Sequence, residues 1–424
     1  MFNLSILLEE SARRYPTKNA FVFANTHLTY AQINGAANQV AAGLRAAGIG
    51  AGDKVALSCL NVPYFPIVYY GILKAGGVVV PLSVLLKRDE ITYHLEDSDA
   101  KAYFCFLGAP GLPMLEEGHA GYTKVAGCTS LYVITAKPED PSPLGDFPTL
   151  GQLMHGQSPT NATARTDGDN TAVIIYTSGT TGRPKGAELS HQNLFLNAMV
   201  SAELFEPQAK DTLLTVLPLF HIFAMTVLMN VGLYRGCTNV LVPRFEAKAV
   251  FDLLEKHSVN FFAGVPTMYW GLLNYSGEDV NITGIAANLK CCISGGASLP
   301  VKVLEDFEAK FGVEILEGYG MSEGSPVVTF NQRKVGRKPG SIGTPVWGVE
   351  VKVIDAEGRE LAAGEKGELV YRGHNVMKGY YNKPDANAET IVDGWLHSGD
   401  IATKDEDGFF YIVDRTKDMI IRGG

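Results

Sequence analysis

A stretch rich in glycine and hydroxyl residues near the middle of the chain has the composition of a phosphate-binding loop. It covers residues 176–186 and reads YTSGTTGRPKG. Glycine lets the backbone adopt positive φ angles and turn its N–H groups toward an anion, and serine and threonine hydroxyls add donors. An arginine and a lysine supply positive charge. We predict that the triphosphate of a nucleotide is bound by Thr177, Ser178, Gly179, Thr180, Thr181, Gly182 and Lys185.

The loop directly follows an apolar segment, residues 172–176, which favours a strand that ends where the loop begins. The loop differs from a Walker A motif, because Gly186 stands where that motif has serine or threonine. A flexible hairpin without a ligand is the alternative. The concentration of phosphate-binding residue types directly after an apolar strand disfavours that alternative.

Residues 177–186 resemble the phosphate-binding signature of the adenylate-forming superfamily, which includes acyl-CoA synthetases, luciferases and nonribosomal peptide adenylation domains. The other motifs of the family follow in order, so the resemblance covers essentially the whole chain. The chain looks most like the large N-terminal domain of a medium- or long-chain fatty acid–CoA ligase. This resemblance implies binding of ATP or AMP and Mg²⁺, a fatty acid as substrate, and coenzyme A as co-substrate.

Residues 218–224, PLFHIFA, resemble the family segment that faces the substrate carboxylate. The resemblance implies that His221 orients this carboxylate and that Phe223 lines the acyl pocket. A histidine satisfied within an apolar core is the alternative. No acidic residue occurs from Leu217 to Asn230. An amino-acid substrate is therefore disfavoured, because burying its ammonium group without a counter-charge costs several kcal/mol.

Two further segments resemble the adenine and metal positions of the family. Residues 294–300, SGGASLP, resemble the strand end beside adenine and the acyl pocket, with a plain turn between strand and helix as the alternative. Residues 317–323 read EGYGMSE. By resemblance, Tyr319 stacks on adenine, Ser322 contacts the α-phosphate and Glu323 binds Mg²⁺. A carboxylate beside a triphosphate needs a cation between them, because two anions in contact repel.

Residues 394–400, GWLHSGD, resemble the ribose motif, in which the carboxylate of Asp400 accepts hydrogen bonds from the two ribose hydroxyls. An aspartate in an ordinary β-turn is the alternative. Downstream, the resemblance implies that Arg415 lies near ribose and phosphate and that Lys417 occupies the hinge position of the family.

Together these motifs define four sets of expected site residues. The catalytic set is His221, Lys185, Ser322 and Glu323, and the metal set is Thr180 with Glu323. The substrate pocket set is His221, Phe223, Gly295, Gly320 and Met321. Besides the loop, the nucleotide set is Gly295, Gly296, Ala297, Glu317, Gly318, Tyr319, Gly320, Met321, Ser322, Asp400 and Arg415.

The elements that must position these residues have the pattern of an α/β fold. Short apolar β-rich runs alternate with helical patterns, which favours two mixed, mainly parallel sheets covered by helices in αβαβα layers. After about Lys338, apolar and polar residues alternate between glycines and aspartates, which predicts a small distorted antiparallel β-barrel. Within one large domain, residues 1–414, we expect approximate subdomains: the first sheet from 55–200, the second from 1–54 with 212–335, and mostly the barrel from 338–414.

Composition excludes several other classes of protein. The 424 residues include 36 lysines and arginines against 45 aspartates and glutamates, a net charge of −9, whereas a nucleic-acid binder is normally basic. The six cysteines have neither zinc spacing nor a disulfide pattern, and the N-terminus does not read as a signal peptide, so we expect a cytoplasmic protein. The uncharged stretch between Asp211 and Arg235 contains Pro218 and His221, which predicts a buried strand, turn and helix and no transmembrane segment.

Family members carry a further small domain after the hinge, with a lysine that bridges the carboxylate and the α-phosphate. Residues 415–424 correspond to the hinge and the start of that domain, and the sequence ends seven residues after Lys417. We therefore expect the domain and its lysine to be absent, and adenylation and thioester formation to be impaired. An aryl acid–CoA ligase, an acyl-AMP ligase and a non-catalytic module that binds nucleotide or acyl chains are the alternatives.

A short basic run before the predicted barrel has two interpretations. Arg333, Lys334, Arg337 and Lys338 suit the phosphates of coenzyme A or a peripheral membrane contact, but they also suit a solvated loop. Acyl chain length is not predicted, and a homodimer is an open expectation.

Overall fold

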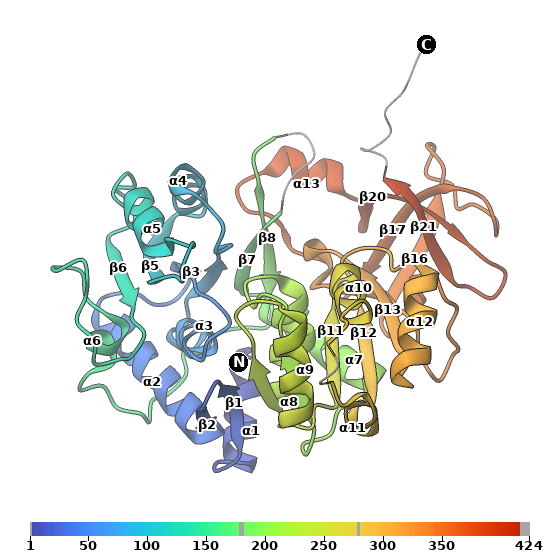
Figure 1. The fold of residues 1–424 in the computed structure, drawn as a ribbon. Helices are drawn as coiled ribbons and strands as arrows, with labels where there is room; N and C mark the ends of the chain where they lie inside the picture. Colours follow the sequence, from blue (N-terminus) through green and yellow to red (C-terminus); the bar gives the residue numbers. More distant parts are fainter. Residues whose placement is uncertain (1, 178–181, 278–279, 416–424) are drawn as a thin grey trace.

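A computed structural model of the protein describes residues 2–177, 182–277 and 280–415. Three sheets lie beside one another, and helices cover the first two (Figure 1). This arrangement confirms the predicted fold class of two mixed, mainly parallel sheets covered by helices, and the predicted small distorted antiparallel β-barrel is a curled five-stranded antiparallel sheet.

The first sheet has seven strands, and its central strands are parallel and buried, as the runs of valine, isoleucine and leucine predict. In spatial order they are β18 (Gly379–Tyr380), β8 (Lys185–Ser190), β7 (Thr171–Thr177), β4 (Val78–Pro81), β3 (Lys54–Ser58), β5 (Ala100–Phe106) and β6 (Ser130–Ile134). The helices of this region are α2 (Tyr30–Ala46), α3 (Tyr64–Ala75), α4 (Arg88–Asp97), α5 (Met114–Tyr122), α6 (Leu150–Met154) and α7 (His191–Phe205).

The second sheet has nine strands, six of them joined in parallel and the others antiparallel at its two ends. In spatial order they are β15 (Thr344–Pro345), β14 (Val327–Phe330), β13 (Ile315–Gly320), β12 (Cys291–Ser294), β11 (Phe261–Gly264), β9 (Thr212–Thr215), β10 (Thr238–Leu241), β1 (Asn19–Phe23) and β2 (Thr26–Thr29). Its helices are α1 (Ile6–Arg14), the π-helix η1 (Ala224–Asn230), α8 (Val231–Arg235), α9 (Ala247–Lys256), α10 (Pro266–Leu273), α11 (Ile282–Asn288) and α12 (Val301–Phe311).

The third sheet is antiparallel and has five strands. They are β16 (Val349–Ile354), β17 (Gly367–Gly373), β20 (Trp395–Lys404), β19 (Ile391–Val392) and β21 (Phe410–Arg415); a 3-10 turn η2 (Ser322–Gly324) and helix α13 (Pro384–Thr390) complete the described elements.

Two short strands from the region expected to be mostly barrel, residues 338–414, belong to the other sheets. Strand β15 pairs with β14 in the second sheet, and β18 pairs with β8 in the first. Both segments lie against strands that would otherwise be sheet edges, and pairing satisfies the backbone groups of those edges.

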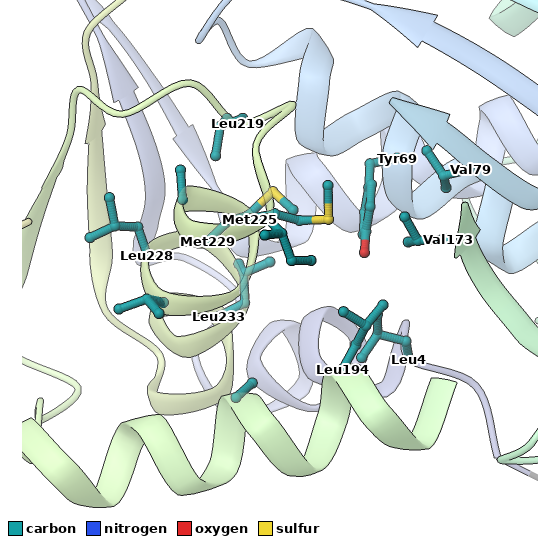
Figure 2. Packing of buried hydrophobic residues seen from close by; sticks show 14 of the residues in the cluster. Leu4, Tyr69, Val79, Val173, Leu194, Leu219, Met225, Leu228, Met229 and Leu233 are labelled. Atoms are coloured by element: carbon teal, nitrogen blue, oxygen red, sulfur yellow. The ribbon is translucent and has the colours of Figure 1, made fainter. Parts of the chain in front are cut away.

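The uncharged stretch after Asp211 forms strand β9, a turn, η1 and α8, as predicted, and it is almost entirely buried. Within the described residues, no helix combines the length and the apolar character needed to cross a membrane. Side chains of η1 and α8 pack between the two α/β sheets, where they meet residues of the first sheet and of α3 and α7 (Figure 2). The labelled members of this core are Leu4, Tyr69, Val79, Val173, Leu194, Leu219, Met225, Leu228, Met229 and Leu233.

A buried histidine ties the start of the chain to α7. Ser190 caps this helix by accepting a hydrogen bond from Asn193 N–H, and His191 is its first residue. The Nδ1 atom of His191 accepts a hydrogen bond from Leu4 N–H at 3.1 Å, and the side chain is 1% exposed. Burial lowers the pKa of His191 to about 4, because an imidazolium in this apolar site would lose its hydration.

This histidine should make the fold sensitive to acid. An unfolded histidine binds a proton below about pH 6.5, whereas folded His191 stays neutral down to about pH 4. The contribution of neutral His191 to the free energy of unfolding should therefore be fully present above pH 6.5. It should fall as the pH drops from there toward 4, and the loss at pH 5 should be on the order of 2 kcal/mol.

His191→Asn removes the titration, so the urea midpoint of this variant should change less between pH 7 and pH 5 than that of the wild type. The same change at the exposed His155 should keep the wild-type fall, and equal falls in the two variants would contradict the assignment.

Candidate active site

A cavity of about 1600 Å³ lies where the three sheets meet. Its walls include the carboxyl ends of β7, β12 and β13 and parts of β17 and β20. Ligands of open α/β sheets bind outside the carboxyl ends of the strands, so this is the expected position for a site. Thr177 and Asp400, more than two hundred positions apart in the chain, both line this one cavity.

The predicted phosphate loop connects two antiparallel strands of the first sheet. Thr177 ends β7, Lys185 begins β8, and these two residues are paired in the register. Lys185 Nζ lies 4.3 Å from the centroid of the Tyr380 ring, and Arg183 Cζ lies 5.3 Å from that of Tyr93. Both cations line the cavity and are attracted by the faces of these rings. These contacts keep positive charge in the cavity at the start of β8.

Glu323 is the buried anion of the site. This residue lies in η2, shortly after β13, and it is 5% exposed. Its Oε1 atom accepts hydrogen bonds from the Thr177 hydroxyl at 3.1 Å and from the Tyr380 hydroxyl at 2.7 Å. Burial and the negative charge of Glu323 raise the pKa of Tyr380 well above its ordinary value, so this hydroxyl stays a donor at every physiological pH.

The oxygens around Glu323 suit a hard cation. Among the described residues, no lysine or arginine forms an ion pair with this carboxylate, and no three acidic, histidine or cysteine side chains converge on a metal position. Mg²⁺ is commonly held by one or two carboxylates together with the phosphates of a substrate. A single buried carboxylate beside a phosphate loop therefore fits Mg²⁺ shared with a nucleotide.

Tyr319 and Asp400 form a second polar contact in the cavity. The Tyr319 hydroxyl donates to Asp400 Oδ2 at 2.5 Å, and Asp400 is 3% exposed. Tyr319 lies near the end of β13 and Asp400 lies in β20, so this bond joins the second sheet to the third. In the backbone register, Arg415 of β21 is the partner of Asp400.

His221 lies in the turn between β9 and η1 and faces the cavity. Its Nδ1 atom accepts a hydrogen bond from Phe223 N–H at 3.2 Å, which places the proton of the neutral ring on Nε2. The surrounding walls lower the pKa of His221 by desolvation, although the ring edge is exposed to the cavity. The neutral ring can therefore donate one hydrogen bond from Nε2 at neutral pH.

Two glycines near the end of β13 let this strand pack closely against neighbouring residues of the cavity wall. A Cβ atom on Gly320 would lie 1.9 Å from the carbonyl oxygen of Pro326, and one on Gly318 would lie 2.5 Å from the Phe330 ring. Distances under 3 Å force neighbouring atoms to move, and at Gly320 the neighbour is backbone. Larger side chains would therefore displace the cavity wall at these two positions.

One wall of the cavity, which we call the acyl wall, is formed by residues of α7, η1 and β14. Helix α7 packs against both of the other elements. The acyl wall carries no charged side chain among the described lining residues, and its members are Ser201, Leu204, Phe205, Val227, Val327 and Phe330.

The predicted site residues fall into three groups. Those that line the cavity are Thr177, Lys185, His221, Phe223, Gly295, Gly296, Gly318, Tyr319, Gly320, Met321, Ser322, Glu323 and Asp400. Those that are described but do not line it are Gly182, Ala297 and Glu317, and Arg415 is described by its backbone pairing. Those that lie outside the described residues are Ser178, Gly179, Thr180, Thr181 and Lys417.

Glu317 differs most clearly from its predicted nucleotide position. It lies two residues before Tyr319 on β13, so it is about 7 Å further than Tyr319 from the carboxyl end of the strand. It is buried, and its Oε2 atom accepts a hydrogen bond from Gly340 N–H at 3.2 Å. The side chain thus supports the loop after β14 instead of reaching the cavity.

Several lining residues were not predicted from the sequence. Tyr380 donates a hydrogen bond to Glu323, and its ring contacts the Lys185 ammonium group. It nevertheless lies in a short Gly-Tyr-Tyr segment without a recognisable sequence pattern. Glu368 and His397 also line the cavity and bind each other at 2.9 Å. His397 belongs to the predicted ribose segment, so that motif was the one available signal for this pair.

The basic run is neutralised by neighbouring carboxylates. Each of its four cations forms an ion pair. The pairs are Arg333 with Glu314, Lys334 with Glu206, Arg337 with Glu308, and Lys338 with Asp405 and Asp407. This pairing favours the solvated loop over a site for phosphates or membrane lipids.

Comparisons with known proteins agree with this geometry. The family model described as AMP-binding enzyme matches residues 8–381. A long-chain-fatty-acid–CoA ligase of Bacillus subtilis (strain 168) is 36% identical, over 99% of this chain and 78% of that protein. A feruloyl-CoA synthase of Amycolatopsis sp is 35% identical, over 97% of this chain and 78% of that protein. The crystal structure of ATP-bound MatB from Rhodopseudomonas palustris has a TM-score of 0.88 at 31% identity, over 100% of this chain and 80% of that one.

The match to the family model spans most of the chain, and two relatives above 30% identity are covered over more than three quarters of their length. These matches agree with the cavity that is lined by Thr177, Glu323 and Asp400. The chain belongs to the AMP-binding enzyme family of adenylate-forming proteins, among its acyl- and aryl-CoA ligases.

Proposed function

We propose that the protein activates a fatty acid with ATP to give an acyl-adenylate and pyrophosphate, and that coenzyme A then takes the acyl group as a thioester. The observation that carries this proposal is the single cavity shared by Thr177, Glu323 and Asp400. Such a cavity suits the triphosphate at one end and the sugar at the other.

The main obstacle to adenylation is charge. The nucleophile is a carboxylate and its target is a phosphate, so both reactants are anions and repel each other. The carboxylate is already ionised at neutral pH, so no general base is required. Catalysis then depends on positioning and on neutralising charge at fixed points.

The chain's own residues are proposed to divide this work. Lys185 lies at the loop, where a cation offsets the charge of the phosphates. His221 donates from Nε2 to the carboxylate and holds it in line with the α-phosphorus. Glu323, with Thr177 and Tyr380 as donors, would hold Mg²⁺, which supplies further positive charge to the phosphates when bound.

The nucleoside is proposed to lie on the opposite side of the cavity. Tyr319 offers its ring to adenine, and Asp400 offers its carboxylate to the ribose hydroxyls. The bond between these two side chains joins the two proposed subsites. Ser322, which precedes Glu323 in the chain and lines the cavity, is proposed to contact the α-phosphate.

The acyl wall supports an apolar acid. Burial of hydrocarbon against such a wall contributes roughly 25 cal/mol per Å². A fatty acid is the first candidate, because a relative of 36% identity is a long-chain-fatty-acid–CoA ligase. An aryl acid is the second candidate, because the feruloyl-CoA synthase is about equally similar.

Adenylate formation with a panel of acids tests the substrate directly. We expect pyrophosphate release with ATP and saturated acids of medium and long chain to exceed release with ferulate and benzoate. Release only with the aryl acids would transfer the proposal to the second candidate. Nucleotide binding without pyrophosphate release from any acid would favour the non-catalytic module, and adenylate that is not consumed by coenzyme A would favour an acyl-AMP ligase.

Three other expectations stay predictions. The 424 residues assayed alone are expected to turn over slowly, and the pyrophosphate-release assay described above measures this rate. A cytoplasmic location agrees with six cysteines that are all free and buried. A homodimer is tested by sedimentation.

Glu323 should be essential for adenylation. Glu323→Gln keeps the shape of the side chain but removes its charge, and it should lower the rate of adenylate formation by about 10²–10³. Tyr380→Phe removes one donor to this carboxylate and should lower the rate by about tenfold. Rates are measured by pyrophosphate exchange at saturating Mg²⁺. Glu357→Gln, on the exposed turn between β16 and β17, is the control, and a Glu323→Gln rate equal to that of the control would reject the proposed role.

His221 should act on the acid and not on the nucleotide. His221→Ala removes the proposed donor to the carboxylate, so the KM for the fatty acid should rise by about tenfold or more. The KM for ATP should stay within about twofold of the wild-type value, because the nucleoside contacts lie on β13 and β20. Equal increases in both KM values would indicate a structural role for the ring.

A further inference from the structure

The hydrogen-bonded pairing of β20 with its neighbouring strand is interrupted next to Asp400. On β17, Glu368 pairs with Ile401, and Val370 pairs with His397. One residue of β17 therefore faces three residues of β20, namely 398–400, which we call the Asp400 bulge. A second irregularity occurs on the other side, where the pairing of β20 with β21 shifts after Ile401.

A regular strand sends alternate side chains to opposite faces, so extra residues are needed to re-aim one of them. Such a bulge also leaves backbone groups without their ladder partners. Gly399 adopts a φ of 72°, a left-handed conformation that glycine accepts at little cost. The position of Asp400 thus depends on whatever holds the bulge.

Glu368 holds the bulge with both of its carboxylate oxygens. Its Oε1 atom accepts a hydrogen bond from Gly399 N–H at 3.0 Å. Its Oε2 atom lies 2.9 Å from His397 Nδ1, which must be the donor because an ionised carboxylate only accepts. The residues on either side of Ser398 are therefore fixed to one side chain of the neighbouring strand.

Ser398 completes the support inside the bulge. Its hydroxyl donates to the carbonyl oxygen of Leu369 at 2.5 Å and accepts from Asp400 N–H at 3.1 Å. Leu369 is the single β17 residue that faces the bulge, so this hydroxyl replaces a missing ladder bond. The Asp400 carboxylate accepts the hydrogen bond from the Tyr319 hydroxyl and lines the cavity.

We propose that Glu368 is a positioning residue for nucleoside recognition: it sets the Asp400 bulge so that the Asp400 carboxylate meets the ribose hydroxyls. The inference rests on the proposed function, which gives Asp400 its ribose role. Both Glu368 and His397 also line the cavity, as Asp400 does, so the support belongs to the same site as the proposed ribose ligand. Loss of Glu368 should weaken recognition of the ribose and leave recognition of the phosphates intact.

Binding of AMP and 2′-deoxyAMP to the full chain, measured by calorimetry, tests this role. The wild type should prefer AMP, and Glu368→Ala should reduce that preference by about tenfold, as expected for a lost charged hydrogen bond. Glu368→Gln keeps one acceptor and should recover part of the preference. Ser398→Ala should reduce it as well, which provides a second variant if Glu368→Ala fails to fold.

The matched control is Glu350→Ala, on the adjacent strand of the same sheet, where Glu350 forms an exposed pair with Arg372. It should leave the preference unchanged. In the Asp400→Ala background, Glu368→Ala should cause no further loss, because both changes act through one carboxylate. Binding of pyrophosphate should be equal in the wild type and in Glu368→Ala.

Two outcomes would overturn the inference alone: a wild-type preference that survives Glu368→Ala, or an equal fall in pyrophosphate affinity, which would indicate general disruption. A wild type that binds AMP and 2′-deoxyAMP equally would instead overturn the ribose role of Asp400, and the inference with it.

Discussion

The burial of one carboxylate, Glu323, constrains the whole site. An ionised carboxylate removed from water is costly unless hydrogen bonds or opposite charge compensate it. Its described donors come from two places in the first sheet, Thr177 on β7 and Tyr380 on β18, whereas Glu323 follows β13 of the second sheet. The two sheets must therefore keep one relative position for this anion to be satisfied. A cation shared with phosphates would complete the compensation, so the same arrangement that holds the fold also prepares the site.

The three sheets supply their polar groups in different ways. The α/β sheets place Thr177 and Tyr319 near the carboxyl ends of strands, and both residues line the cavity there. The third sheet is antiparallel and presents Asp400 from within a strand. Regular pairing would hold this residue in the ladder alternation, which explains why β20 is irregular on both of its edges at this point. The side chain of Glu368 then does what ladder bonds do elsewhere in the sheet.

The sequence alone predicted those parts of the fold and the site whose cause is local. Apolar runs such as 172–176 indicated buried parallel strands, and the glycine-rich loop indicated phosphate binding, because these properties depend on neighbouring residues. Tyr380 was not predicted, because its role arises from a two-residue strand that pairs with β8 nearly two hundred positions away. Glu317 was assigned to the nucleotide from its motif, but it lies further from the strand end, and its side chain accepts a hydrogen bond from Gly340 N–H. The positions of both side chains depend on contacts with residues distant in the sequence, and such contacts leave no local pattern.

The uncharged acyl wall is compatible with both of the proposed substrate classes, alkyl acids and aryl acids. Hydrocarbon chains and aromatic rings gain similar free energy per Å² when buried, so an uncharged wall selects an apolar acid without choosing between the two. A charged substituent is excluded more strongly, because an ammonium buried beside Val227 and Phe330 would have no described counter-charge on this wall. Shape must make the remaining choice. Under the proposed function, Leu204 and Phe205 of α7 are candidates for making this choice, because both side chains line the cavity on this wall.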